Sequence, residues 1–259
     1  MKNNLKQSQI DKIQVVSYEN NFPKVKLVNP SNSGYLLIAL EIDKRPPIGF
    51  FIESRKKKEA IKIAKVFSSK SLKHHFIKES NVFKALIIPP GRGNFLKQRP
   101  NALIAKFDLV LLIEFENYEK CKQFSSTLEW ADFEKKILSF SKSSITLTGK
   151  NIRSIGNVDH TKNGVFLFNY FFADDLKQNL GIWEFTAGWF QYQTNLDNSN
   201  LILPDMSKSF PYKIINHCRW DNLFKILPSL LFKKSFKNFV LKNFELNNVA
   251  AMPILYRLA

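Results

Sequence analysis

Hydrophobic and polar positions along this chain alternate between two spacings. Short apolar runs rich in β-branched residues predict strands, and apolar positions three and four residues apart predict helices. A helix is predicted over Lys56–Phe67, and a second follows Asn117, whose short side chain can accept hydrogen bonds from free backbone N–H groups. The predicted strands in this part are Tyr35–Ile42, Asn81–Ile88, Phe107–Phe115 and Ser144–Ile155. Residues 34–158 therefore have the order β-α-β-β-α-β.

The second part of the chain repeats this order. Helices are predicted over Leu176–Thr194 and, after a possible cap at Asp221, over Leu223–Leu246. Pro253 lies inside the last strand, which predicts an edge or bulge position because proline has no N–H to donate. The predicted strands are Val165–Phe172, Leu201–Leu203, Tyr212–Trp220 and Ala250–Leu258. Residues 161–259 therefore form a second β-α-β-β-α-β unit.

A repeated split β-α-β pattern predicts an α+β fold with two ferredoxin-like βαββαβ units, at 34–158 and 161–259, after a basic N-terminal arm at 1–33. Each unit leaves one sheet face without helices. Packing the two units sheet to sheet covers both faces, and a pocket can remain between them. The pattern leaves open a monomer with an intrachain, pseudo-dimeric α/β barrel and a homodimer that pairs units from two chains.

Composition narrows the class of protein. The chain has 259 residues and is 44% hydrophobic, which is enough for a buried core. The longest apolar run, Val165–Ala173, is far shorter than the roughly 18 residues that cross a bilayer, and Met1–Gln14 has no apolar signal segment. Two cysteines, Cys121 and Cys218, provide neither a disulfide framework nor a zinc quartet. We expect a soluble protein of a reducing, cytoplasmic compartment.

The net charge of +17 points to an anionic partner, but two features weaken that interpretation. The basic residues are 32 Lys and 7 Arg, whereas phosphate and base recognition favours arginine. Residues 1–100 contain 20 basic and 7 acidic side chains, so most of the excess lies in the first half. Binding of nucleic acid or an anionic surface through residues 1–100 is therefore a disfavoured alternative.

The order of elements, with Asn216 and Trp220 four apart on a strand that leads into a helix, resembles the antibiotic biosynthesis monooxygenase group of the dimeric α/β-barrel superfamily. The segments 186–190 and 194–204 also resemble small barrel proteins of that kind. The resemblance implies a protein that binds a small hydrophobic or aromatic molecule, or a monooxygenase-like enzyme that uses molecular oxygen without a cofactor. It implies catalytic roles for Asn216, Trp220 and Asn169.

Strand alternation places Asn216, Cys218 and Trp220 on one face. By the resemblance, the amides hydrogen-bond a quinol or enolate oxygen and the indole stacks on the substrate ring. The expected cavity is lined by Asn169, Asn216 and Trp220 and lies between the two sheets. In the first unit Leu111 and Phe115 stand at the positions of Asn216 and Trp220, so that unit is expected to have no site.

Cofactors and further binding residues follow from the same resemblance. A heme-degrading branch takes an axial histidine from the second helix, but Asp221–Asn248 contains none, so heme is disfavoured and neither cofactor nor metal is expected. Secondary candidates for substrate binding are Trp189, Tyr256, His217 and Arg219. A non-catalytic stress-response or interaction scaffold is the remaining alternative, because one fold hosts many functions.

Overall fold

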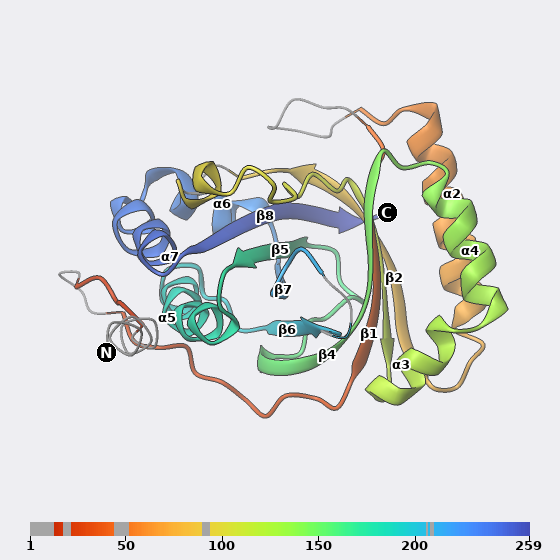
Figure 1. Cartoon of the computed structure of the whole chain (residues 1–259), viewed down its shortest axis with the longest axis horizontal. Coiled ribbons are helices and arrows are strands. Elements are labelled where there is room, and N and C mark those ends of the chain that lie inside the picture. Colours follow the sequence, from red (N-terminus) through yellow and green to blue (C-terminus); the bar gives the residue numbers. More distant parts are fainter. Residues whose placement is uncertain (1–12, 18–21, 44–51, 90–93, 206, 208–209) are drawn as a thin grey trace, which may run out of the picture.

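The computed structural model describes residues 13–17, 22–43, 52–89, 94–205, 207 and 210–259. Eight antiparallel strands close into one barrel in the order β1-β3-β2-β8-β5-β7-β6-β4 (Figure 1). The strands are β1 (Gly34–Glu41), β2 (Ile77–Ile87), β3 (Leu109–Phe115), β4 (Ser143–Gly156), β5 (Val165–Ala173), β6 (Ser199–Pro204), β7 (Ile214–Trp220) and β8 (Val249–Leu258). Within the described ranges, every helix is too short or too polar to cross a bilayer.

The strand order contains the same arrangement twice. Strands β4-β1-β3-β2 and β8-β5-β7-β6 each have the order fourth-first-third-second, as in a ferredoxin-like sheet. The two sheets face each other and are joined edge to edge, β2 to β8 and β4 to β6. The predicted α+β, ferredoxin-like barrel is therefore confirmed, and a single chain supplies both sheets. The unit boundaries at 34–158 and 161–259 stay a prediction.

Helices cover the outer face of each sheet, at opposite ends of the molecule (Figure 1). The first sheet carries α2 (Arg55–Ser71), α3 (Tyr118–Ser125) and α4 (Leu128–Leu138), and a 3-10 turn, η1 (Phe95–Gln98), precedes β3. The second sheet carries α5 (Leu176–Thr194), α6 (Leu223–Phe232), the π-helical turn η2 (Phe236–Leu241) and α7 (Lys242–Leu246). Asn117 caps α3 as expected, accepting a hydrogen bond from the backbone N–H of Lys120.

Two details of the last predicted helix were wrong. The N-cap of α6 is Asn222 and not Asp221, whose carboxylate instead pairs with Arg219 at 3.1 Å. The single predicted helix over 223–246 is interrupted where Lys233 takes an extended backbone conformation, and a π-helical turn follows. Pro228 lies inside α6, where its missing N–H removes one helical hydrogen bond.

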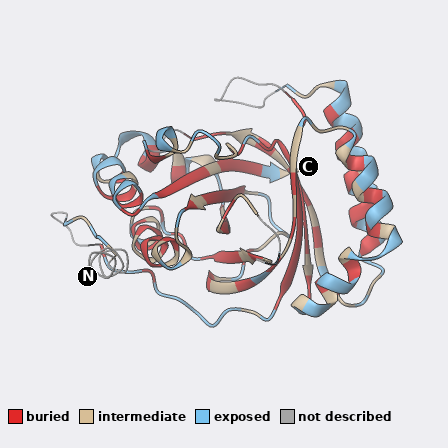
Figure 2. Cartoon of the chain, in the orientation of Figure 1, coloured by how far each residue is buried: buried red, intermediate tan, exposed pale blue. Residues whose placement is uncertain are grey.

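The space between the two sheets is a packed core. Aromatic side chains fill it, with ring centroids of Phe83 and Phe168 5.1 Å apart and those of Phe168 and Tyr256 5.3 Å apart. An eight-stranded barrel has an interior just wide enough for side chains to fill. The predicted cavity between the sheets is therefore wrong, and much of the barrel is formed by buried residues (Figure 2).

The described part of the predicted arm packs on the second half of the chain. The backbone N–H of Val25 donates to Glu184 of α5, and Val28 forms an isolated bridge with Ser154 of β4. Phe22 is buried and lies 5.0 Å from Phe239, centroid to centroid. Residues 22–28 thus cover the outside of α5.

Pro253 lies in β8 where only one side of the strand is paired. It is opposite Asn169 of β5, while β2 pairs with β8 over Leu255–Leu258 alone. Strand β8 is therefore not an edge strand of the closed barrel, but Pro253 lies where one side of it has no partner strand, which suits a residue without an N–H.

A buried ion pair links α2 to the first sheet. Lys57 Nζ lies 3.2 Å from Asp108 Oδ2, and both side chains are almost fully buried. The backbone N–H groups of Ile42 and Asp43 also donate to this carboxylate, at 2.7 and 3.2 Å. Asp108 therefore holds together the end of β1, the start of β3 and the first turn of α2. Removing one partner of such a pair leaves an uncompensated buried charge.

We expect Asp108→Asn to lower the free energy of unfolding by about 3 kcal/mol, because Lys57 keeps its charge in the core. The double variant Lys57→Met/Asp108→Asn should recover at least half of this loss. Urea denaturation of the two single variants and the double variant measures the coupling. A double variant as unstable as the sum of the singles would show that the two charges do not interact.

Candidate functional site

The phase of strand alternation decides which side chains of the second sheet meet its helices. Asn169 of β5 and Asn216 of β7 are directly opposite each other in the strand register. Both side chains point toward the helices, on the same face as Leu167 and Cys218, whereas Phe168 and its neighbours fill the barrel. The three predicted catalytic residues, Asn169, Asn216 and Trp220, therefore lie together, but beneath the helices and not between the sheets.

Asn169 lies between two small cavities under the helix layer, which we call together the Asn169 chamber. Their volumes are about 20 and 30 Å³, enough for a water molecule or dioxygen in each. Both cavities are lined by Leu167, Asn169, Phe190 and Phe244. The first is also lined by Thr186, Ser199, Asn216, Cys218 and Trp220, and the second by Pro89, Ile226, Leu230, Phe236 and Pro253. The chamber thus has a polar end and an apolar end.

The Asn169 side chain is held in the chamber wall with an unused acceptor. Its Oδ1 is buried and has no hydrogen-bond partner. The neighbouring Asn216 accepts a bond from Ser199 Oγ at 2.5 Å, and its Nδ2 has only a 3.7 Å contact with Cys218 Sγ. A buried unpartnered acceptor costs about 1–3 kcal/mol of stability. Asn169 Oδ1 can accept a hydrogen bond from a group that enters the chamber.

The first sheet shows what the fold itself requires at this position. Its first and third strands pair Ile38 with Leu111 where the second sheet pairs Asn169 with Asn216. Both Ile38 and Leu111 are buried against α2 to α4. The same architecture therefore packs an apolar pair there, and the two amides are an addition specific to the second sheet.

Comparison with solved structures identifies the architecture. A protein named "anthrone oxidase-like protein" superposes with a TM-score of 0.60 at 7% identity, over 88% of this chain and 92% of its own. A protein from Fusobacterium nucleatum named "Putative monooxygenase" superposes with a TM-score of 0.52 at 9% identity, with the same coverage of both chains. No protein-family model and no curated protein matches the sequence. The chain has the dimeric α/β-barrel fold.

Within this α/β barrel the chamber wall is electrically neutral. The thiol of Cys218 is fully buried, and burial raises its pKa, so it is not a thiolate nucleophile. Trp220 Nε1 donates to Thr194 Oγ1 at 3.1 Å, which fixes the indole against the wall. No Asp, Glu, Lys, Arg or His is among the described lining residues, and the described residues contain no group of three potential metal ligands. The chamber can hydrogen-bond and enclose a molecule, but it holds no base.

None of the four secondary candidates is among the described residues that line the chamber. Trp189 is a buried residue of α5, and its Nε1 donates to Ser235 Oγ. Tyr256 points into the barrel and donates to the carbonyl oxygen of Phe107. Arg219 lies at a barrel end and donates to the carbonyl oxygen of Asn163. The alternation that turns Asn216 toward the helices turns His217 and Arg219 the other way.

Three polar side chains, joined by hydrogen bonds, enter the α/β barrel between its two halves. No spacing in the sequence predicted this group. His217 Nδ1 lies 3.0 Å from the carbonyl oxygen of Leu167 and so carries a proton, which leaves Nε2 as an acceptor. His160 Nε2, 2.8 Å from it, must donate. The other nitrogen of His160 forms a hydrogen bond with Glu79 Oε2 at 2.5 Å. Glu79, His160 and His217 are thus joined by consecutive hydrogen bonds.

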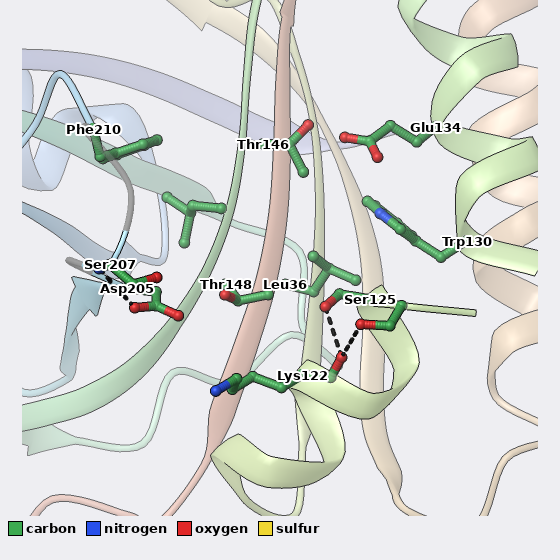
Figure 3. Close-up of a pocket in the computed structure, with 12 residues that line it drawn as sticks. Leu36, Lys122, Ser125, Trp130, Glu134, Thr146, Thr148, Asp205, Ser207 and Phe210 are labelled. Carbon is green, nitrogen blue, oxygen red and sulfur yellow. Dashed lines mark hydrogen bonds between the residues drawn. The ribbon is translucent and has the colours of Figure 1, made fainter. Parts of the chain in front are cut away.

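A larger polar hollow of about 490 Å³ opens between α3, α4, β4 and the segment after β6 (Figure 3). Asp205 accepts bonds from Tyr118 Oη at 2.6 Å and from the backbone N–H of Ser207 at 3.0 Å. These bonds lower the pKa of Asp205 to about 2, while burial and the carboxylate raise the pKa of Tyr118 to about 12. The Asp205 carboxylate is already hydrogen-bonded within the protein, so the hollow is a weaker candidate than the chamber.

We expect the stability of the α/β barrel to fall as the pH drops below about 6.5, the ordinary pKa of histidine. Burial and the nearby charge of His160 hold the pKa of His217 well below that value, so the unfolded chain binds a proton that the folded chain does not. The loss is at most about 1.4 kcal/mol per pH unit.

Urea denaturation at pH 7.5 and 5.5 measures this dependence. His217→Gln should flatten it, whereas His75→Gln, a change at an exposed histidine, should leave it as in the parent protein. An equal pH dependence in all three proteins would show that His217 does not cause it.

Proposed function

We propose that the Asn169 chamber binds a small hydrophobic or aromatic molecule that carries a hydroxyl or carbonyl oxygen, and that the protein acts on it as a cofactor-independent, monooxygenase-like enzyme. The carrying observation is the buried, unpartnered Oδ1 of Asn169, which faces a cavity at a position that the first sheet fills with an apolar pair. The remaining wall is apolar and neutral, which suits an uncharged ring system.

The chemistry proposed for the chamber is the oxidation of an activated methylene group by dioxygen. In the reaction R₂CH₂ + O₂ → R₂C=O + H₂O, the substrate carbon supplies all four electrons, one oxygen atom enters the substrate and the other leaves as water. Since the wall holds no base, the substrate must itself be acidic enough to form an enolate. Asn169 Oδ1 would accept a hydrogen bond from the hydroxyl group of the enol form, and Asn216 Nδ2 would donate one to the oxygen of the enolate form. The likeness to an anthrone oxidase-like fold supports this substrate class.

Entry of a ring system requires the helix layer to move, because 20 and 30 Å³ are far below the several hundred Å³ of a ligand pocket. On the side of α6, η2 and α7, the helix layer has interruptions that favour such movement. Pro228 interrupts the hydrogen bonds of α6, Lys233 breaks the helix, and the next turn is π-helical. Ile226, Leu230 and Phe236 on this segment line the chamber, so a displacement of α6 enlarges it directly.

We expect Asn169→Leu to raise the free energy of unfolding by about 1 kcal/mol, because it removes an unpartnered buried acceptor. The same variant should bind anthrone at least tenfold more weakly than the parent protein, because the ligand loses its polar partner. Urea denaturation measures the first effect. Quenching of Trp183 and Trp220, which both line the first cavity, measures the second.

Asn216→Leu is the comparison variant for Asn169→Leu. It should lower the free energy of unfolding, because Ser199 Oγ loses its hydrogen-bond acceptor. Oxygen uptake with anthrone, corrected for the reaction without protein, tests turnover, and one O₂ should be consumed for each anthraquinone formed. Loss of stability in Asn169→Leu with unchanged anthrone binding would assign Asn169 to the fold. Binding without oxygen uptake would retain the ligand site and reject the enzyme.

A further inference from the structure

The outer face of α6 is apolar although it faces solvent. Phe224 and Phe232 are 87% and 79% exposed and Leu231 is 50% exposed. Together with exposed Pro228 they are spaced at four, seven and eight residues, which places them on one side of the helix. The opposite side, with Ile226 and Leu230, is buried over the second sheet. We call Phe224, Pro228, Leu231 and Phe232 the α6 apolar face.

Positive charge surrounds this face. The segment from Asn222 to Phe244 contains five lysines and no acidic residue, and all five lysines are exposed. They are Lys225, Lys233, Lys234, Lys237 and Lys242. The nearest acidic residues in the sequence are already engaged: Asp221 pairs with Arg219, and Glu245 accepts a bond from Asn94.

Two other exposed regions of the described residues combine these properties less well. On α2, which carries more basic residues, the groove toward α4 also contains Glu59, Glu129 and Asp132, and Lys70 pairs with Glu129 at 3.5 Å. Leu128 is 82% exposed but stands at the start of α4, between Thr127 and Glu129. The segment from α6 to α7 lies at the end of the molecule away from α2 (Figure 1), and its outward side is exposed (Figure 2).

We infer that the α6 apolar face docks the protein on an anionic lipid bilayer. A short helix with phenylalanine and leucine on one face and lysines beside it lies in the plane of the bilayer interface, with its apolar side among the upper acyl chains. Anionic headgroups then neutralise the lysines. A second copy of the chain fits less well, because an isologous contact through this face would place lysines against lysines with no carboxylate between them.

Docking does not depend on the function proposed for the chamber. It does place the chamber directly beneath the bilayer surface, because the buried side of the docked helix forms part of the chamber wall. A hydrophobic molecule dissolved in the bilayer would then have a short route to the cavity.

Co-flotation with vesicles of phosphatidylcholine alone, or with 30% phosphatidylglycerol, tests the inference in the absence of any ligand. We expect binding to the anionic vesicles that weakens with added salt. Phe224→Ser/Phe232→Ser should lower the partition coefficient by at least about tenfold, because two aromatic side chains no longer enter the interface. Lys234→Gln/Lys237→Gln should lower it by about fivefold for each lysine.

Matched control variants distinguish binding through the α6 apolar face from nonspecific hydrophobic binding and from an effect of the total charge. Leu128→Ser removes an equally exposed apolar side chain, and Lys56→Gln/Lys58→Gln removes two exposed lysines of α2. Both should bind as the parent protein does. Absence of binding by the parent protein, or equal losses in the controls, would overturn the inference. Concentration-dependent dimerisation that only Phe224→Ser/Phe232→Ser abolishes, without vesicle binding, would instead assign the face to a second copy.

Discussion

The structure depends on the need to bury the second face of each sheet. Three helices on one side of a four-stranded sheet leave its other side bare, and in this chain that side carries Phe83 on β2 and Phe166, Phe168 and Tyr170 on β5. Each bare side finds its cover in the other sheet, and the pairing of β2 with β8 and of β4 with β6 leaves no open edge. Side chains therefore fill the interior of the closed barrel. A ligand site must lie in the outer layers, where helices cover the sheets. The chamber under α5 and α6 follows from this constraint.

The order of elements was predictable from the sequence, because each element carries its own local signal. The bounds of α5 at Leu176–Thr194 and the cap at Asn117 match the prediction, since apolar spacing and a short polar residue decide them locally. The side of the sheet on which Asn216 lies was not predictable. Strand β5 is apolar on both faces, because one face meets helices and the other meets the opposite sheet, so hydrophobicity could not fix the phase. His160 gave no signal either, because its partners Glu79 and His217 are distant in sequence.

Comparison of the chamber with the equivalent position in the first sheet distinguishes residues that the fold requires from residues that it does not require. Equivalent strands hold Ile38 beside Leu111 in one sheet and Asn169 beside Asn216 in the other, under similar helix layers. An apolar pair suffices for packing, so Asn169 reduces stability unless a group in the chamber donates a hydrogen bond to its Oδ1. The helix break at Lys233 and the π-helical turn that follows it also reduce stability locally, in the same helix layer. These departures from ideal packing occur in the part of the structure that surrounds the Asn169 chamber.

Helix α6 connects the two sites that we propose. Its buried side forms part of the chamber wall, and its exposed side is apolar and flanked by lysines, so a movement of α6 at the proposed membrane face would change the chamber wall. The net charge of the chain is largest in the first hundred residues, yet there basic and acidic side chains are mixed on the α2 surface. Around α6 the positive charge is smaller in total, but no acidic residue lies in the segment to reduce it. Exposed phenylalanine side chains lie beside these lysines. Local arrangement, more than the total of +17, therefore determines where an anionic surface can bind.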